Sequence, residues 1–263
     1  MRRRGILVDV TKCVGCGECV TACQKANAQP AHEARRFDEQ TFTYLTQRGP
    51  ELFVRRLCMH CESPACASVC PVRALVKDPR GPVTYDPEKC MGCRYCLAAC
   101  PFGVPTYEWR SRTPRVRKCE MCRGRAKGPA CAEACPAEAT VTGERSALVA
   151  EARRRLRAEP KLYHPHLYGL SEVGGTSVLY IGPKSPAALG LPGGVVQHPM
   201  PELTWRALRH VPDVALFGSV ILGGLYWLTS RREQVRRKEG SAGKEEVRRR
   251  KGSAGKEGGD EGK

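Results

Sequence analysis

Residues 90–101 read CMGCRYCLAACP and place four cysteines within eleven positions, with a proline directly after the last of them. The spacing is C-x2-C-x2-C-x3-C-P. A tight loop of this kind can place three thiolates around one face of a cubane cluster, which has a metal at each of four corners. The fourth thiolate, three residues further on, already lies on a departing helix and faces a neighbouring cluster. This stretch therefore predicts clusters in pairs.

The same run recurs in the chain before residue 136. The four motifs are Cys13, Cys16, Cys19 and Cys23; Cys58, Cys61, Cys66 and Cys70; Cys90, Cys93, Cys96 and Cys100; and Cys119, Cys122, Cys131 and Cys135. The first repeats the spacing of the third, although Gln24 stands in place of the proline. The second and fourth carry extra residues before their third cysteine. Such internal repetition predicts an α+β fold of two ferredoxin-like units, each holding a pair of [4Fe–4S] clusters.

Sixteen cysteines could also form disulfides or structural zinc sites. Disulfides suit a secreted chain, but residues 5–8 are too short an apolar run for a signal peptide. Zinc prefers two CxxC pairs separated by a longer loop. Because four near-copies end in x3-Cys, and because sixteen ligands divide among four cubanes with none left over, we expect four [4Fe–4S] clusters. A structural zinc-binding module, colourless and loaded with zinc, is the alternative from another class.

The net charge of +17 raises the question of nucleic-acid binding. The tail after residue 230 accounts for +5 of it. Four oxidised cubanes with their thiolates would add roughly −8 to the cysteine-rich region. Much of the positive charge is thus expected to balance clusters, and no nucleic-acid partner is predicted.

The chain also carries no nucleophile–base pattern, phosphate loop or substrate-pocket motif, so we expect a non-catalytic protein. His60 lies inside CMHC and is expected to line a cluster.

Five stretches resemble a known family. They are VRRLCMHCESPACASVCPVRAL at 54–75, YDPEKCMGCRYCLAACPFGVP at 85–105, KCEMC at 118–122, CAEACPAEA at 131–139 and HPHLYGLSEVGGTSVLYIG at 164–182. The chain resembles the four-cluster iron–sulfur subunits of membrane-bound respiratory oxidoreductases. The fifth stretch, which has no cysteine, is most similar to the NiFe hydrogenase and formate dehydrogenase branches.

The resemblance implies that motifs exchange their last cysteines. Cys13, Cys16 and Cys19 would share a cluster with Cys135, and Cys119, Cys122 and Cys131 one with Cys23; Cys58, Cys61 and Cys66 would share one with Cys100, and Cys90, Cys93 and Cys96 one with Cys70. Spacing alone equally allows motif one to pair with two and three with four. All sixteen cysteines are ligands under either scheme.

The resemblance also implies a function and partners. Electrons would enter from a catalytic subunit, most naturally a NiFe hydrogenase oxidising hydrogen in anaerobic respiration. They would leave to an integral-membrane subunit that reduces quinone. The alternative is the corresponding subunit of a formate dehydrogenase or another molybdopterin oxidoreductase.

The regions around the motifs complete the expected organisation. Residues 1–145 form the four-cluster domain, with an insert at 27–49 whose segment 42–47 alternates like a strand. This insert either covers a cluster as a surface hairpin or docks a catalytic subunit. Residues 146–205 form an extension for docking, wrapped over the core, with a helix at 146–158 ended by Pro160 and an apolar strand at 178–181.

Residues 211–229 predict a single transmembrane helix. VPDVALFGSVILGGLYWL, at 211–228, would span roughly 27 Å as a helix. More basic residues follow it than precede it, which predicts a cytoplasmic C-terminus and a periplasmic cluster domain at the inner membrane. Since no export signal is evident, we expect the folded chain to cross with a partner that bears a twin-arginine signal.

The segment after the span, residues 231–263, contains QVRRKEGSAGKE and then the similar EVRRRKGSAGKE, and we expect a disordered basic tail.

Overall fold

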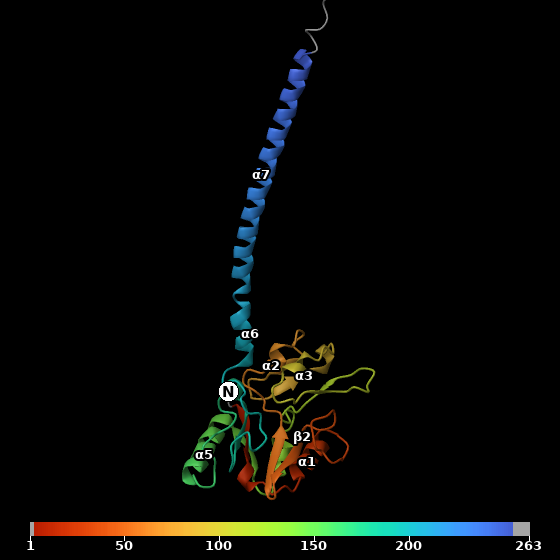
Figure 1. The fold of residues 1–263 in the computed structure, drawn as a ribbon. Helices are drawn as coiled ribbons and strands as arrows, with labels where there is room; N and C mark the ends of the chain where they lie inside the picture. The colour runs from red at the N-terminus through yellow and green to blue at the C-terminus, as the bar shows by residue number, and fades with distance from the viewer. Residues whose placement is uncertain (1–2, 255–263) are drawn as a thin grey trace, which may run out of the picture. The chain divides into compact units, whose positions relative to one another are not determined.

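The computed structural model describes residues 3–254 of the chain. The chain divides into two units, Met1–Thr204 and Trp205–Lys263, and residues 3–254 of them are described. Figure 1 shows the mixed helices and strands of the first unit and the long helix α7 of the second. The first unit contains all sixteen cysteines, so it is the part that matters for metal binding.

A three-stranded sheet forms the centre of the first unit. β1 (Arg4–Asp9) is the middle strand; β8 (Thr140–Glu144) pairs with it in antiparallel and β9 (Val178–Ile181) in parallel orientation. Ile6, Leu7 and Val8 of β1 are all buried, since apolar residues cover both faces of the strand. The sheet thereby joins the start of the chain, the end of the fourth cysteine motif and the segment after it.

The segment after the cysteines is part of this core. α5 (Arg145–Ala158) packs Leu148 and Ala152 against Leu7 and Leu179 of the sheet, and both views show it on one side of the sheet. The predicted helix and the predicted strand are therefore present. The expected boundary at residue 145 is wrong as a structural division, because β9 hydrogen-bonds to β1 and buries all four of its residues.

The cysteine motifs lie on short helices and turns that repeat in pairs. The helices are α1 (Glu18–Ala26), α2 (Ala65–Ser68), α3 (Tyr95–Ala99) and α4 (Ala130–Glu133), and the 3-10 turns are η1 (Val10–Lys12), η2 (Pro87–Lys89) and η3 (Glu172–Gly174). Asp9 and Asp86 cap η1 and η2 through the same type of hydrogen bond, just before the first and third motifs. α2 and α4 both begin with Ala-Cys-Ala after a proline.

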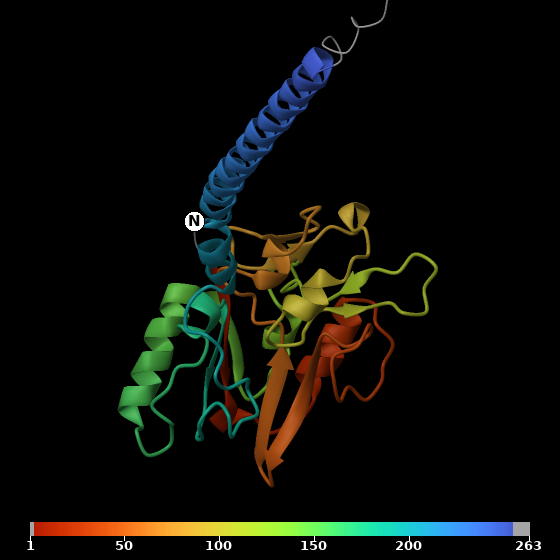
Figure 2. The same ribbon diagram turned by 45° about the horizontal axis from the view of Figure 1, so that its top comes forward.

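The four cysteine motifs pack in two pairs. α1 packs against α4, which brings the first and fourth motifs together. α2 packs against α3, which brings the second and third motifs together. Three hairpins complete the first unit: β2 (Thr43–Gly49) with β3 (Leu52–Leu57), β4 (Leu75–Lys77) with β5 (Val83–Tyr85), and β6 (Thr106–Tyr107) with β7 (Val116–Arg117). Figure 2 shows the β2–β3 hairpin in orange. Its first strand, Thr43–Gly49, overlaps the predicted strand at 42–47.

One turn ties the β4–β5 hairpin to the central sheet. Gly81 has φ +122°, and a Cβ at this position would lie 2.3 Å from the backbone oxygen of Arg4. Ser177 also donates its hydroxyl to the Gly81 carbonyl at 3.0 Å. Only glycine combines that backbone conformation with so close an approach.

We expect Gly81→Ala to lower the free energy of unfolding by about 2–3 kcal/mol, because strain and a backbone clash act together. The thermal midpoint should fall by about 5–10 °C for a unit of this size. Gly124→Ala is the matched control, since a Cβ there meets nothing within 4 Å. Equal midpoints for both variants would contradict the prediction.

The described part of the second unit, residues 205–254, is almost entirely helical. α6 (Met200–Leu208) ends just beyond the unit boundary, and α7 runs from Val211 to Ala254. The segment Met200–Arg236, which comprises α6 and the first part of α7, is long and apolar enough to cross a membrane, as judged by length and composition alone; none of its most apolar window is buried within the chain.

The expected disorder from residue 231 is wrong up to Ala254, where the chain is helical. The physical reason is that Glu, Lys, Arg and Ala have high helix propensity, and a helix already formed by the apolar segment extends without a new nucleation cost. The rest of the predicted tail, residues 255–263, lies outside the described part of the chain.

Candidate metal centres

The first thiol group surrounds a cavity beside the central sheet. Its members are Cys13, Cys16, Cys19 and Cys135, which line the cavity together. Leu45 of β2 lines the same cavity, so the β2–β3 hairpin covers this group. Burial raises the pKa of Cys13; a hydrogen bond from the Gly15 amide opposes the rise, and the nearby thiols of Cys135 and Cys16 add to it.

The second thiol group consists of Cys23, Cys119, Cys122 and Cys131. Burial raises the pKa of Cys23 to about 12, and the thiols of Cys131 and Cys122 contribute to the rise. Burial also raises the pKa of Cys119 well above its usual value, and among the thiols Cys23 contributes most to the rise. α1 supplies Cys23 and α4 supplies Cys131, so this group depends on the packing of these two helices.

The second and third motifs supply the third and fourth thiol groups. The third is Cys58, Cys61, Cys66 and Cys100, and the fourth is Cys70, Cys90, Cys93 and Cys96. Burial raises the pKa of Cys61 strongly, followed by the effects of Cys58, Cys100 and Cys66. Burial likewise raises the pKa of Cys96 to about 11, and Cys90, Cys93 and Cys70 act in the same direction.

The four groups form a continuous row. Cys19 of the first group interacts with Cys131 of the second, Cys119 of the second with Cys58 of the third, and Cys66 of the third with Cys96 of the fourth. Each group takes three thiols from one motif and one from another. Motifs one and four exchange their last cysteines, as do motifs two and three, and this is the arrangement that the family resemblance implies.

The donor set suits clusters of iron and sulfide. In residues 3–254, no three Cys, His, Asp or Glu side chains converge closely enough to hold a single metal ion; the thiols of the first group instead surround a cavity. Backbone amides point at several sulfurs, including those of Cys70 at 3.2 Å and Cys119 at 3.3 Å. Such N–H donors stabilise thiolates and bound sulfide in a dry site.

Comparison with known proteins agrees with this chemistry. A 4Fe-4S binding domain matches residues 6–26, and a 4Fe-4S dicluster domain matches residues 51–145. A protein of Nitratidesulfovibrio vulgaris is 38% identical over 256 residues, which cover 89% of this chain and 69% of that protein. The Hydrogenase-2 operon protein HybA of Escherichia coli O157:H7 is 37% identical over 229 residues, covering 67% of this chain and 69% of HybA.

The nitrate-inducible formate dehydrogenase iron–sulfur subunit of Escherichia coli K12 is 33% identical over 197 residues, covering 66% of each chain. The chain belongs to the ferredoxin-type iron–sulfur subunits of respiratory oxidoreductases. Membership in this family favours iron–sulfur clusters over the zinc-binding module that composition alone left open.

His60 of this iron–sulfur subunit is buried between two cysteines of the third thiol group. The Val83 amide donates to its Nδ1 at 2.9 Å, so the ring proton is on Nε2. That Nε2 has no hydrogen-bond partner within residues 3–254. Burial lowers the pKa of His60 well below its usual value, and Lys118 and Lys77 add to the effect, which keeps the ring neutral. A buried N–H without an acceptor fits a site whose acceptor is a cluster sulfide.

Two buried cations of this iron–sulfur subunit were not singled out from the sequence. Arg55 and Lys118 are both buried. Arg55 lies three residues before the second motif, and Lys118 lies directly before the fourth. Lys118 donates its ammonium to the carbonyls of Cys119, at 2.7 Å, and Val83. Their position directly before a motif was the available signal, but in a chain with 44 Lys and Arg residues it did not stand out.

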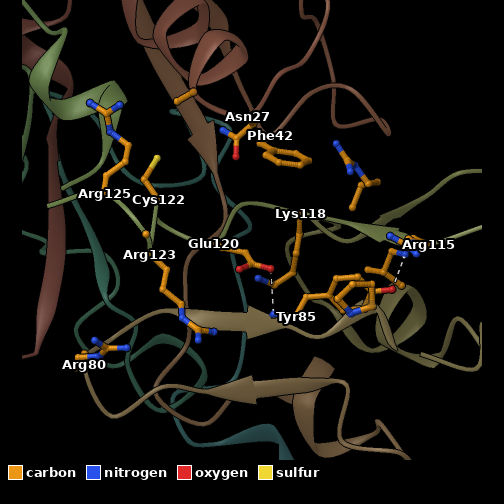
Figure 3. Close-up of a pocket in the computed structure, with 15 residues that line it drawn as sticks. Asn27, Phe42, Arg80, Tyr85, Arg115, Lys118, Glu120, Cys122, Arg123 and Arg125 are labelled. Carbon is orange, nitrogen blue, oxygen red and sulfur yellow. Dashed lines mark hydrogen bonds between the residues drawn. The ribbon is translucent and has the colours of Figure 1, made fainter. Parts of the chain in front are cut away.

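A large open cavity lies beside the second thiol group. Figure 3 shows Cys122 next to Arg123 and Arg125 on one side, with Lys118, Glu120 and Tyr85 across from them. Most of its arginines already have acidic partners: Arg125 pairs with Glu133, Arg117 with Glu108, Arg115 with Glu88 and Arg80 with Asp78. These pairs neutralise much of the charge, and we assign the cavity no ligand of its own.

Proposed function

We propose that this chain is a non-catalytic electron relay that holds four [4Fe–4S] clusters, one in each thiol group, through all sixteen cysteines. The observation that carries the proposal is the continuous row of four groups, in which neighbouring groups interact through Cys19 and Cys131, Cys119 and Cys58, and Cys66 and Cys96. Bound clusters would supply one-electron carriers along that row.

The protein contributes buried thiols, apolar surroundings and an exposed apolar side chain near each end of the row. Burial raises the pKa of several of the thiols and so disfavours bare thiolates, and bound iron would supply compensating positive charge. Apolar side chains such as Leu45 and Val8 line the cavity of the first group. Near the two ends of the row, Val14 and Met91 are each 65% exposed. These exposed apolar side chains support contact with partner proteins at both ends.

The catalytic partner that we propose is a NiFe hydrogenase oxidising hydrogen, and the electron acceptor is an integral-membrane subunit that reduces quinone. Support comes from the similarity to HybA and from the segment 164–182, which contains β9 of the central sheet. A formate dehydrogenase is the second candidate, supported by the 33% identity to its iron–sulfur subunit.

For the membrane arrangement we propose one transmembrane span in α7, with the cluster domain in the periplasm and the C-terminus in the cytoplasm. The candidate span supports the anchor. Arg231, Arg232 and Arg236, directly after the apolar segment, support the orientation.

Gentle detergent purification from the native membrane tests the function. We expect a brown complex with about sixteen iron atoms per copy of this chain, paramagnetic signals on reduction, and a NiFe large and small subunit. A molybdenum- or tungsten-containing partner would replace the hydrogenase assignment with the formate dehydrogenase one. Stoichiometric zinc without acid-labile sulfide would exclude the relay altogether.

A further inference from the structure

Arg55 is a charged side chain in the interior of the first unit. It lies on β3, three residues before Cys58, and is 2% exposed. Its Nε donates to the hydroxyl of Thr43 at 3.0 Å, and its Nη1 donates to the hydroxyl of Thr140 at 3.3 Å. Both acceptors are neutral, so these hydrogen bonds orient the guanidinium without balancing its charge.

No acidic side chain in the described chain forms an ion pair with Arg55. Arg155 shows how the charge of an enclosed arginine is usually balanced. It forms ion pairs with Asp9 at 2.9 Å and with Glu151 at 2.7 Å. A buried guanidinium without an anion would be strongly destabilising. The anion that balances Arg55 must therefore come from something that the site binds.

The surroundings of Arg55 identify that anion. Arg55 lines the cavity of the first thiol group, and, against the lowering effect of burial, the nearby sulfur of Cys131 in the second group raises the pKa of its guanidinium through charge attraction. Cys19, at the contact between the two groups, interacts with it as well. A [4Fe–4S] cluster with four thiolates carries about −2 when oxidised and one charge more when reduced.

We propose that Arg55 is a positioning residue that acts as the shared counter-cation of the first and second clusters and raises the reduction potentials of both. The inference rests on the proposed relay function. A fixed positive charge favours the more negative, reduced state of each neighbouring cluster, and low dielectric strengthens this effect. Because the guanidinium is held by two threonines and does not deprotonate in proteins, its effect does not change with pH.

The test compares Arg55→Gln, Arg55→Lys and a matched control, Arg56→Gln, in the intact complex. Arg56 is the next residue on β3, but its guanidinium donates to the carbonyl of Gly190. For each variant, iron and labile sulfide are measured, followed by a redox titration monitored by electron paramagnetic resonance. Signals of the first and second clusters are assigned with Cys16→Ser and Cys122→Ser.

For Arg55→Gln we expect negative shifts in the midpoint potentials of the first and second clusters, and unchanged potentials for the third and fourth. Arg55→Lys should retain most of both potentials, and Arg56→Gln all four. If Arg55→Gln loses iron from the first two clusters instead, retention by Arg55→Lys supports the proposal because it retains the charge.

Two results would overturn it: full iron content with four unchanged potentials in Arg55→Gln, or equal loss in Arg55→Gln and Arg55→Lys. Neither result would affect the relay function, whose failure would instead appear as zinc and no paramagnetic signal in the unaltered protein.

Discussion

Replacing Cys16 and Cys135 together by alanine should remove no more iron than replacing either one alone. Both thiols line one cavity, so each single variant and the double variant lose the same cluster, about a quarter of the iron. Cys122 and Cys135 belong to one motif but to different thiol groups. The Cys122→Ala/Cys135→Ala double variant should therefore lose two clusters and about half of the iron.

This comparison separates the two pairings that spacing allows. If the fourth motif shared clusters with the third, the Cys16/Cys135 variant would lose twice the iron of either single variant. Iron and acid-labile sulfide are measured chemically, and the remaining clusters are counted by electron paramagnetic resonance. Cys93→Ala, in the fourth thiol group, is the control for general collapse, since it should leave the signal of the first cluster intact. Serine variants serve as milder substitutions.

Placing an arginine at Ile221 should release the chain from the membrane. Ile221 lies near the middle of the apolar part of α7 and is exposed within the chain. An arginine at the centre of a transmembrane helix costs about 2.5–3.5 kcal/mol in insertion, or roughly 100-fold in the inserted fraction. Alkaline extraction of membranes from cells that express the chain measures this fraction directly.

Thr229→Arg is the matched control. Thr229 lies at the end of the apolar segment, where an arginine side chain can reach the interface and its cost is small. Equal extraction of Ile221→Arg and Thr229→Arg would show that α7 does not span the bilayer. Both variants could also stay in the membrane fraction because a partner subunit holds them there. Repeating the extraction in cells that lack that partner separates this case from anchoring by α7.

Several features followed from the sequence because they depend on local spacing. The four cysteine motifs, the helix now seen as α5, the strand β9 and the start of α7 at Val211 lie where they were expected, to within a residue. Short-range patterns of this kind reflect helix and strand periodicity and need no knowledge of distant contacts. The continuation of α7 to Ala254 does not follow from apolar content, because it depends on the helix propensity of Glu, Lys, Arg and Ala.

The sequence by itself determined the number and type of sulfur ligands and the presence of an apolar helix, since both are written in consecutive residues. Only the tertiary structure decided which thiols lie together, because packing of α1 on α4 and of α2 on α3 joins residues about a hundred and about thirty positions apart. It also decided that β9 joins the central sheet and that Arg55 lies beside the first and second thiol groups, with no acidic partner among residues 3–254. These arrangements arise from burial of apolar and charged groups across the whole unit, which no local pattern records.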